Sequence, residues 1–484
     1  MSKLWKIVLA LWLVAAPSYG AGPIMIAGGG SEGDIGDTTS WSYRLYPHLL
    51  DGGDVNGDGR ITVAVIADSS QSSFIPQYFK WLGADDAFNV IVVSRNQAND
   101  PNVVDAVRGA DAIFIKGGDQ GEYYDLWNGT RLEDNIRYVV GLNGGVGGTS
   151  AGAMSVSQYA FAGGQDYISL DVLQNAQTQY LNDTDGGSGI HTDFLGFLPN
   201  TVVDSHFADR GRLPRLLGIM AKASEDNANP NILGIGISDQ TGLWINGQSA
   251  AVIGVGSVSF LRQTPQTVVR RPNNAPLYMT NVQADVLTEG WSFNLSSRTI
   301  TGQPADTQAV SYAGNSAANV NSLTIRGNNK NDEKFFAFKT TYGNQGYSLI
   351  PTTSSTYIFN SVGTVDSQNS DLRGAIQETL LRGLYDYPSF TGVMVSVGGN
   401  ITRSSSNPNA LSFGATNRFT KEAASVIIDG KLTSAKSLSP YVSTSDSGNG
   451  SLRTAALNNL RIHVLGQTST WGTTYNSQTH AVQP

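Results

Sequence analysis

Short apolar runs alternate with helix-like segments and glycine-rich turns along the first part of the chain, up to about Gly254. Runs rich in Val, Ile and Ala, separated by helices, are typical of parallel strands buried on both faces. The pattern therefore predicts an α/β fold, with a doubly wound, mostly parallel sheet and helices on both faces. The predicted strands begin at Pro23, Ile61, Asn89, Ala112, Asn200 and Ile232.

The second part of the chain has a different composition, rich in Ser, Thr, Asn and Gly, with scattered strand-like runs such as KFFAFKTTY and GVMVSVGG. One amphipathic helix is predicted there, because Leu372, Ile376, Leu380 and Leu384 recur every four residues. We therefore expect a first domain over residues 21–297 and a β-rich C-terminal region of unknown role over residues 298–484.

The N-terminus carries two lysines, then an apolar run from Ile7 to Ala16, then small residues. This order is typical of a secretory signal peptide. A membrane anchor is disfavoured, because the run is shorter than the ~20 residues that cross a bilayer. We expect residues 1–20 to be removed and the mature protein to be secreted, to the periplasm or the medium, without a membrane partner.

Composition narrows the chemistry. The chain has 484 residues, a formal net charge of -8 and no cysteine. The negative charge disfavours binding to nucleic acid, whose phosphates need basic partners. The absence of cysteine excludes disulfides, thiol nucleophiles and cysteine metal sites. No cofactor is expected.

A candidate nucleophile, Ser150, lies in the segment GGTSAGA. A nucleophile on a tight strand-to-helix turn needs small neighbours, because the backbone is strained and the hydroxyl must project from it. The helix start behind Ser150 would present backbone amides, that of Ala151 first, to a developing oxyanion. The alternative is that Ser150 only caps a helix after a glycine-rich loop.

A nucleophilic serine needs a base, and the chain has five histidines. His206 directly follows a predicted strand, so we expect it at the edge of the sheet that also carries Ser150. Asp239 follows another predicted strand and could orient His206 and stabilise its cationic form. Gly117 and Gly118 follow a third predicted strand, and the backbone amide of Gly118 is a second candidate oxyanion donor.

Three arginines, Arg210, Arg212 and Arg215, follow His206 closely. Such a run is usually a solvated basic helix face. Beside a nucleophile it could instead hold a carboxylate through charge-assisted hydrogen bonds.

One segment resembles half of a calcium loop, since Asp54, Asn56 and Asp58 alternate before a glycine. The twelfth position would be Val65, where a calcium loop needs a bidentate glutamate. A polar turn is therefore favoured over a metal site, and no metal is predicted.

Several ordered segments together resemble the cyanophycinase-like serine peptidases. They cover roughly residues 23 to 297, and the segments are PIMIAGGGSEGD, AIFIKGGDQ, GGTSAGA, DSHFADRGRLPRL, GIGISDQTGL, AVIGVGSV and VQADVLTEGWSFNL. The resemblance implies a fold related to class I glutamine amidotransferases, with Ser150 as nucleophile, His206 as general base and an acidic residue near Asp239. Residues that it implies in the substrate pocket are Gln120, Asp204, Ser205, Arg210, Arg212 and Arg215.

The chain departs from the family pattern at two points. Many relatives have DQHF where this chain has Asp204-Ser205-His206-Phe207, so Ser205 replaces a glutamine. The acidic cluster common after the GIGI segment is reduced here to the single carboxylate of Asp239.

The resemblance implies an exported serine exopeptidase that hydrolyses cyanophycin, a poly-aspartate with arginine on each side chain, to β-Asp-Arg dipeptides. The alternatives are an aspartyl dipeptidase acting on short acidic peptides, or a non-catalytic binding protein on the same fold. The partners expected are cyanophycin or another aspartyl peptide and, as a homodimer, a second copy of the chain.

Overall fold

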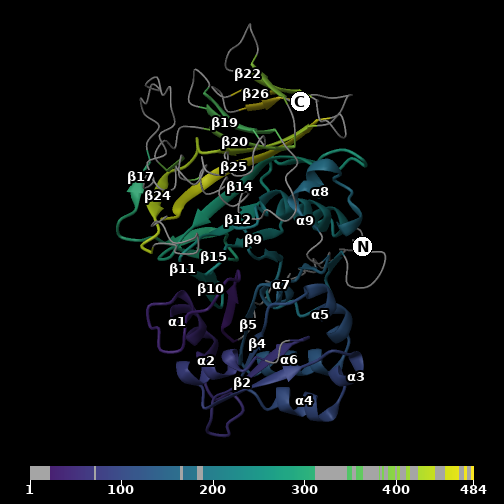
Figure 1. Cartoon of the computed structure of the whole chain (residues 1–484), viewed down its shortest axis with the longest axis vertical. Coiled ribbons are helices and arrows are strands. Elements are labelled where there is room, and N and C mark those ends of the chain that lie inside the picture. The colour runs from purple at the N-terminus through teal and green to yellow at the C-terminus, as the bar shows by residue number, and fades with distance from the viewer. Residues whose placement is uncertain are drawn as a thin grey trace, which may run out of the picture.

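Two large sheets, lying one above the other in Figure 1, organise the chain. The computed structural model describes residues 22–69, 72–163, 167–181, 189–310, 346–351, 356–362, 381, 384–385, 391–397, 400–403, 410–414, 423–441, 453–467, 474–476 and 481–483. The predicted signal peptide lies outside these residues. Among them, no helix is long and apolar enough to span a membrane.

The first sheet has nine strands among the described residues, in the order β16-β15-β11-β10-β1-β5-β4-β2-β3. The run from β1 to β3 is parallel throughout, and β10, β11, β15 and β16 extend it antiparallel. The strands are β1 (Ile24–Ala27), β2 (Thr62–Ala67), β3 (Asp86–Ile91), β4 (Ala112–Ile115), β5 (Gly145–Thr149), β10 (Thr241–Asn246), β11 (Ser249–Gly254), β15 (Ser292–Asn294) and β16 (Thr299–Gly302).

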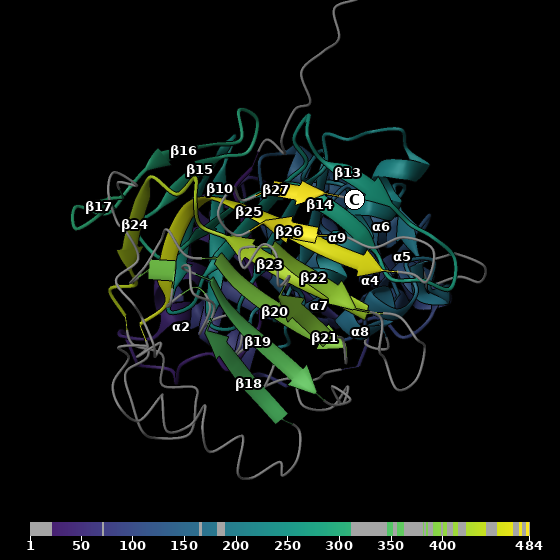
Figure 2. The same cartoon turned by 90° about the horizontal axis from the view of Figure 1, so that it is seen from above.

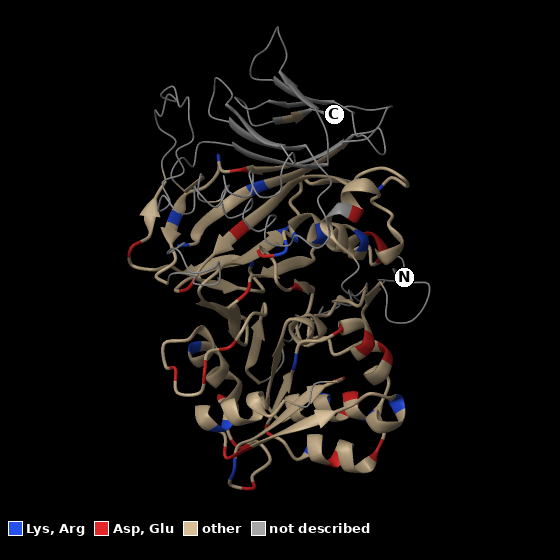
Figure 3. Ribbon diagram, in the orientation of Figure 1, with Lys and Arg blue, Asp and Glu red and all other residues tan. Residues whose placement is uncertain are grey.

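Both faces of the parallel strands are buried, as their apolar sequences predict. In β1, Ile24 and Ile26 belong to the hydrophobic cluster on one face, and Met25 and Ala27 belong to the cluster on the other. Helices cover both faces, so the predicted doubly wound architecture is confirmed. Figure 3 shows acidic and basic residues interspersed on these outer helices.

The helices have the following bounds: α1 (Trp41–Leu45), α2 (Phe74–Leu82), α3 (Arg95–Ala98), α4 (Pro101–Arg108), α5 (Gln120–Trp127), α6 (Arg131–Gly141), α7 (Ala151–Ser155), α8 (Ser169–Gln174) and α9 (Leu213–Asp226), with short 3-10 helices η1 (Tyr46–Leu50) and η2 (Gln179–Leu181). The aromatic-rich α1, η1 and α2 pack on one face of the first sheet, and α4 to α7 pack on the other.

The second sheet has twelve strands among the described residues and runs β18-β19-β20-β23-β25-β14-β12-β9-β8, with β13, β17 and β24 attached beside it. It begins with a parallel pair, β8 (Thr201–Asp204) and β9 (Leu233–Ile237). His206 follows β8, so the expectation that it lies at the edge of the sheet carrying Ser150 is wrong. The sequence pattern of a buried strand does not say which of two sheets the strand joins.

The second sheet is continuous across residue 297, where a domain boundary was expected from composition. Strand β14 (Tyr278–Leu287) lies before this point and pairs antiparallel with β25 (Ala455–Gln467). Figure 2 shows β18, β19, β20, β23 and β25 of this sheet side by side. The remaining strands of this sheet are β12 (Val258–Arg262), β13 (Val268–Arg270), β17 (Gln308–Ala309), β18 (Gly346–Pro351), β19 (Thr356–Val362), β20 (Thr391–Val397), β23 (Ala423–Asp429) and β24 (Ala435–Leu438).

The C-terminal region is rich in β structure where it is described. The run GVMVSVGG falls on β20 except for its last two residues. Those two, KFFAFKTTY and most of the predicted amphipathic helix lie outside the described residues. Two smaller sheets contain β6 (Ala160–Phe161) with β7 (Ile190–His191), and β21 (Asn400–Arg403) with β22 (Ala410–Gly414), β26 (Thr474–Asn476) and β27 (Ala481–Gln483).

Candidate active site

Ser150 occupies the one-residue turn between β5 and α7. Its backbone angles are φ 53° and ψ -119°, a region that residues with a side chain rarely adopt. The Ser150 backbone N–H donates to the Ala27 carbonyl at 3.0 Å, which ties the turn to the neighbouring strand β1. The backbone at Ser150 is therefore strained, as the sequence predicted for a nucleophile on a tight strand-to-helix turn.

The glycines around Ser150 allow the flanking strands to approach closely. A Cβ atom at Gly147 would lie 1.7 Å from the Met25 carbonyl oxygen, and one at Gly152 would lie 2.2 Å from that of Ile115. Both contacts are with backbone, which cannot move aside as a side chain can. The glycine pattern therefore reflects the packing of β5 and α7 between β1 and β4.

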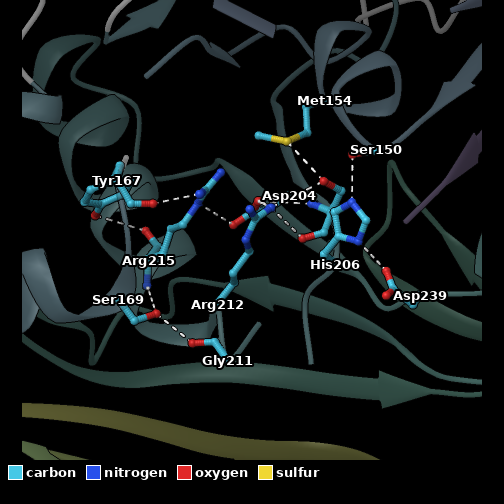
Figure 4. Close-up of polar contacts among 11 residues, drawn as sticks. Ser150, Met154, Tyr167, Ser169, Asp204, His206, Gly211, Arg212, Arg215 and Asp239 are labelled. Carbon is cyan, nitrogen blue, oxygen red and sulfur yellow. Dashed lines mark hydrogen bonds and ion pairs between the residues drawn. The ribbon is translucent and has the colours of Figure 1, made fainter. Parts of the chain in front are cut away.

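His206 and Asp239 form a hydrogen-bonded series with Ser150 (Figure 4). Ser150 Oγ lies 2.8 Å from His206 Nε2, and His206 Nδ1 is within hydrogen-bond distance of an Asp239 carboxylate oxygen. If Nδ1–H donates to Asp239, Nε2 is left as the acceptor for the Ser150 hydroxyl proton. The arrangement can withdraw a proton from Ser150 and stabilise the resulting imidazolium.

The His206 ring is positioned by the loop that follows β1. The His206 backbone has φ 45° and its N–H donates to the Gly28 carbonyl at 2.9 Å. A Cβ atom at Gly29 would lie 2.2 Å from Cε1 of the ring, so a side chain there would displace the imidazole. In the sequence this loop is recognisable only as part of a motif, and no local pattern indicates its contact with His206.

Burial lowers the pKa of His206, and the positive charges of Arg210 and Arg212 lower it further, while Asp239 raises it. The net direction is downward from the ordinary value. His206 is therefore held in its neutral form, the form that accepts a proton.

The position of Asp239 is fixed by a hydrogen bond of its backbone as well as by the contact of its side chain with His206. The Asp239 N–H donates to the Asp209 carboxylate at 2.7 Å, and its side chain is 27% exposed, against 12% for His206. Asp209 lies just after His206 in sequence and was not singled out there. Only the fold shows that it braces the next strand end.

The turn at Gly117 and Gly118 lies directly against Ser150. A Cβ atom at Gly117 would lie 3.2 Å from the Ser150 Cβ. Among the described residues, the backbone N–H groups of Gly118 and Ala151 donate to no other group. Gln120 begins α5 beside this turn and is 7% exposed.

Most of the residues that the resemblance placed in a substrate pocket are buried and paired with one another. Asp204 is fully buried, with its two carboxylate oxygens 3.1 Å from Arg212 Nη1 and 3.1 Å from Arg215 Nε. Arg212 Nη1 also donates to the Ser205 carbonyl at 2.9 Å, and Arg215 Nη1 donates to the Tyr167 carbonyl at 2.7 Å (Figure 4). A substrate-lining role for these residues stays a prediction.

Arg210 differs from the other two arginines. It is half-buried, and its side chain forms no hydrogen bond or ion pair with the described residues. Burial lowers the pKa of its guanidinium, while the negative charge of Asp239 raises it in part. Ser205, by contrast, is buried, and its hydroxyl lies 3.3 Å from the sulfur of Met154 in α7. Arg210 is therefore the guanidinium best able to meet a substrate carboxylate.

Residues 64–253 match the model of peptidase family S51. The chain is 29% identical to a cyanophycinase from Nostoc sp. over 46% of this chain and 70% of that protein, and 29% identical to one from Geminocystis herdmanii over 48% and 82%. The matched residues and these relatives together support a serine-type, cyanophycinase-like peptidase. Similar solved structures include a peptidase from an acI-B1 Actinobacterium, 20% identical with a TM-score of 0.38 over 58% of this chain and 98% of that one. A putative peptidase E from Listeria monocytogenes is 13% identical, with a TM-score of 0.30 over 49% and 99%.

The S51 match contains Ser150, His206 and Asp239 but neither the loop after β1 nor the C-terminal strands. Gly28 and Gly29, which contact His206, precede it, and β14 and β25 follow it. The geometry of the site thus depends on parts of the chain on both sides of the matched residues.

The segment that resembles half of a calcium loop lies away from Ser150. It precedes β2 and so lies near the amino-terminal ends of the parallel strands, whereas Ser150 follows the carboxyl end of β5. The Asp54 carboxylate accepts the N–H groups of Gly57 and Gly59 at 2.7 and 2.8 Å, and Asp58 accepts that of Arg60. Within the described residues, no three acidic or histidine side chains are grouped so as to hold a metal ion.

Proposed function

We propose that this chain is an exported serine exopeptidase that hydrolyses cyanophycin to β-Asp-Arg dipeptides. The hydrogen-bonded series from Ser150 through His206 to Asp239 carries the proposal. The names of the two cyanobacterial relatives support the substrate class. Export is supported by the N-terminal pattern of lysines, apolar run and small residues.

In the first half of the reaction, Ser150 Oγ attacks the scissile carbonyl carbon while His206 Nε2 takes the hydroxyl proton. Asp239 stabilises the imidazolium that forms. The backbone N–H groups of Gly118 and Ala151 are the donors for the oxyanion. His206 then gives its proton to the leaving amine, and an acyl-enzyme ester on Ser150 remains.

In the second half, a water molecule attacks the ester carbon and His206 Nε2 takes one proton from it. The tetrahedral intermediate collapses, Ser150 Oγ leaves, and His206 returns the proton to it. The products are a free carboxylate and the original enzyme. Each proton that His206 accepts is thus given back within the same half-reaction.

Recognition of the substrate is assigned first to Arg210. A β-Asp-Arg unit carries carboxylates, and a half-buried guanidinium without an ion pair in the described structure can bind one bidentately. Arg212 and Arg215 are less available, because both are paired with the buried Asp204 carboxylate.

The decisive experiment incubates the purified chain from Ala21 onward with cyanophycin granules and identifies the products by mass. Ser150→Ala is compared in parallel, with Ser249→Ala, an exposed serine on β11, as the matched control. We expect β-Asp-Arg from the parent and from Ser249→Ala, and none from Ser150→Ala. Dipeptide from the first time points would indicate cleavage from the chain end.

The alternatives give different results in the same experiment. Intact polymer together with labelling of Ser150 by a serine-reactive phosphonate would indicate a peptidase for short acidic peptides. Intact polymer without labelling would indicate a binding protein. Dipeptide release by Ser150→Ala near the parent rate would refute the assignment of Ser150.

A further inference from the structure

Three segments far apart in sequence meet around Arg44, a residue of α1. The Arg44 guanidinium forms an ion pair with Glu289, in the turn between β14 and β15, and its carbon Cζ lies 3.5 Å from the centre of the Tyr441 ring. The side chains of Arg44 and Glu289 are each 18% exposed, so water screens the pair only partly. Arg44, Glu289 and Tyr441 are called the Arg44 cluster below.

The position of Tyr441 is itself set by the C-terminal region. Tyr441 follows β24, which pairs with β25, and its N–H donates to Ser439 Oγ at 3.2 Å. Ser437 Oγ, in β24, accepts the buried indole N–H of Trp291 at 2.8 Å. The C-terminal region is therefore built into the turn that carries Glu289.

Glu289 connects the cluster to the turn formed by residues 254–256. The carboxylate that pairs with Arg44 also accepts the backbone N–H of Gly254 at 2.8 Å. Gly254 has φ +138°, and a Cβ atom there would lie 2.4 Å from the Gln240 carbonyl oxygen. The turn thus rests directly on the backbone that follows Asp239.

The same turn holds the Asp239 loop by hydrogen bonds. The N–H of Val255 donates to the Gln240 carbonyl at 3.0 Å, and the N–H of Gly256 donates to Thr241 Oγ1 at 2.7 Å. Thr241 Oγ1 in turn donates to the Asp239 carbonyl at 3.1 Å. A continuous series of contacts therefore runs from the C-terminal region to the residue that orients His206.

We propose that the C-terminal region serves catalysis through the Arg44 cluster, with Glu289 as a positioning residue that sets the Asp239 loop. This inference rests on the proposed function, because it needs Ser150, His206 and Asp239 to act together. It assigns β24 and the Tyr441 segment that follows it a role inside the enzyme, in place of a separate binding module.

The test measures the rate of Ser150 labelling by a serine-reactive phosphonate, and kcat and KM on the peptide substrate, as functions of pH. Glu289→Ala should lower the labelling rate and kcat by up to about 100-fold, the loss expected from a small misplacement of a reacting group. KM should stay within about twofold, since Glu289 touches no substrate-binding residue. Glu289→Gln keeps an acceptor for Gly254 but loses the charge facing Arg44, so its loss should be about tenfold.

The pH profile separates positioning from a general loss of structure. His206 faces Ser150 and Asp239 and senses Arg210 and Arg212, and of these groups Asp239 raises its pKa. A displaced Asp239 therefore moves the acid limb of the labelling rate to lower pH. A merely structural role for Glu289 would lower the unfolding midpoint and leave this limb in place.

Matched variants serve as controls. Tyr441→Phe keeps the ring over Arg44 and should behave as the parent, whereas Tyr441→Leu should lower the labelling rate. Glu225→Gln breaks the ion pair with Arg271 at the end of α9 and should change neither quantity.

Each outcome decides between the two proposals. If Glu289→Ala leaves both the labelling rate and its acid limb unchanged, the further inference is overturned and the proposed function stands. No labelling of the parent would overturn the proposed function and the inference with it. If Glu289→Ala does not fold, Glu289→Gln and Tyr441→Leu are judged by the same criteria.

Discussion

The two sheets contribute differently to the candidate active site. The first sheet supplies Ser150 and the turn with Gly118 from neighbouring parallel strands, and the second supplies His206 and Asp239 from its own parallel pair. The distance from Ser150 Oγ to His206 Nε2 therefore spans the junction between the sheets. Catalysis in this chain therefore depends on how the two sheets pack against each other, and on the contacts that fix their relative position.

Glycine also has different uses in the two sheets. In β5, glycines make room for backbone carbonyls of the flanking strand, as at Gly147 beside Met25. In β9, Gly234 makes room for the Met220 sulfur at the end of a flexible side chain. The packing at Gly147 is therefore rigid, whereas at Gly234 a side chain can adjust.

The largest effect is expected from removing one reactive residue of each sheet. Ser150→Ala and His206→Ala should each lower kcat by about 10⁶-fold, and the double variant should be no slower, because the two residues act as a unit. Turnover of the peptide substrate measures this. Additive losses would show that the sheets contribute independently, contrary to the shared site.

A methyl group at the glycines should separate rigid from adjustable packing. Gly147→Ala should lower the free energy of unfolding by about 4 kcal/mol, because a backbone carbonyl occupies the position. Gly234→Ala should cost about 1 kcal/mol, because Met220 can change rotamer. Denaturant unfolding measures both values, and equal losses would contradict the contrast between the sheets.

The buried charges of the second sheet should matter more than exposed ones. Asp204→Asn removes the only carboxylate paired with both Arg212 and Arg215 in the described structure, and it should destabilise the chain by about 3 kcal/mol. Asp226→Asn breaks the more exposed pair with Lys222 on α9 and should cost less than about 0.5 kcal/mol. Similar losses from both variants would refute a special role for the buried cluster.

The smallest effect concerns pH at the junction. Because burial lowers the pKa of His206, the acid limb of kcat/KM should lie below pH ~6.5, the ordinary histidine value. Between the lowered pKa of His206 in the folded chain and its ordinary value of ~6.5, the unfolded chain binds more protons at His206 than the folded chain does. The contribution of His206 to the free energy of unfolding should therefore fall as pH falls through this range. An acid limb above pH ~6.5 would show that Asp239 outweighs burial.

Much of this site could be predicted from local sequence. The glycines around Ser150, the strand before His206 and the strand before Asp239 all carry clear local patterns, and the structure brings these three residues together. The contacts of Gly29 with His206, of Asp209 with Asp239 and of Glu289 with Gly254 could not be predicted. Each joins segments whose sequence spacing carries no periodic signal.

The sequence by itself predicted the α/β class, several of the strands and Ser150, His206 and Asp239 as candidate residues, because apolar periodicity and turn chemistry are local properties. Only the tertiary structure decided that His206 and Asp239 belong to a second sheet and that β14 and β25 join across residue 297. Strand pairing depends on hydrogen bonds between backbones that any sequence can make. The choice of partner is therefore made by packing of whole faces, which no single segment encodes.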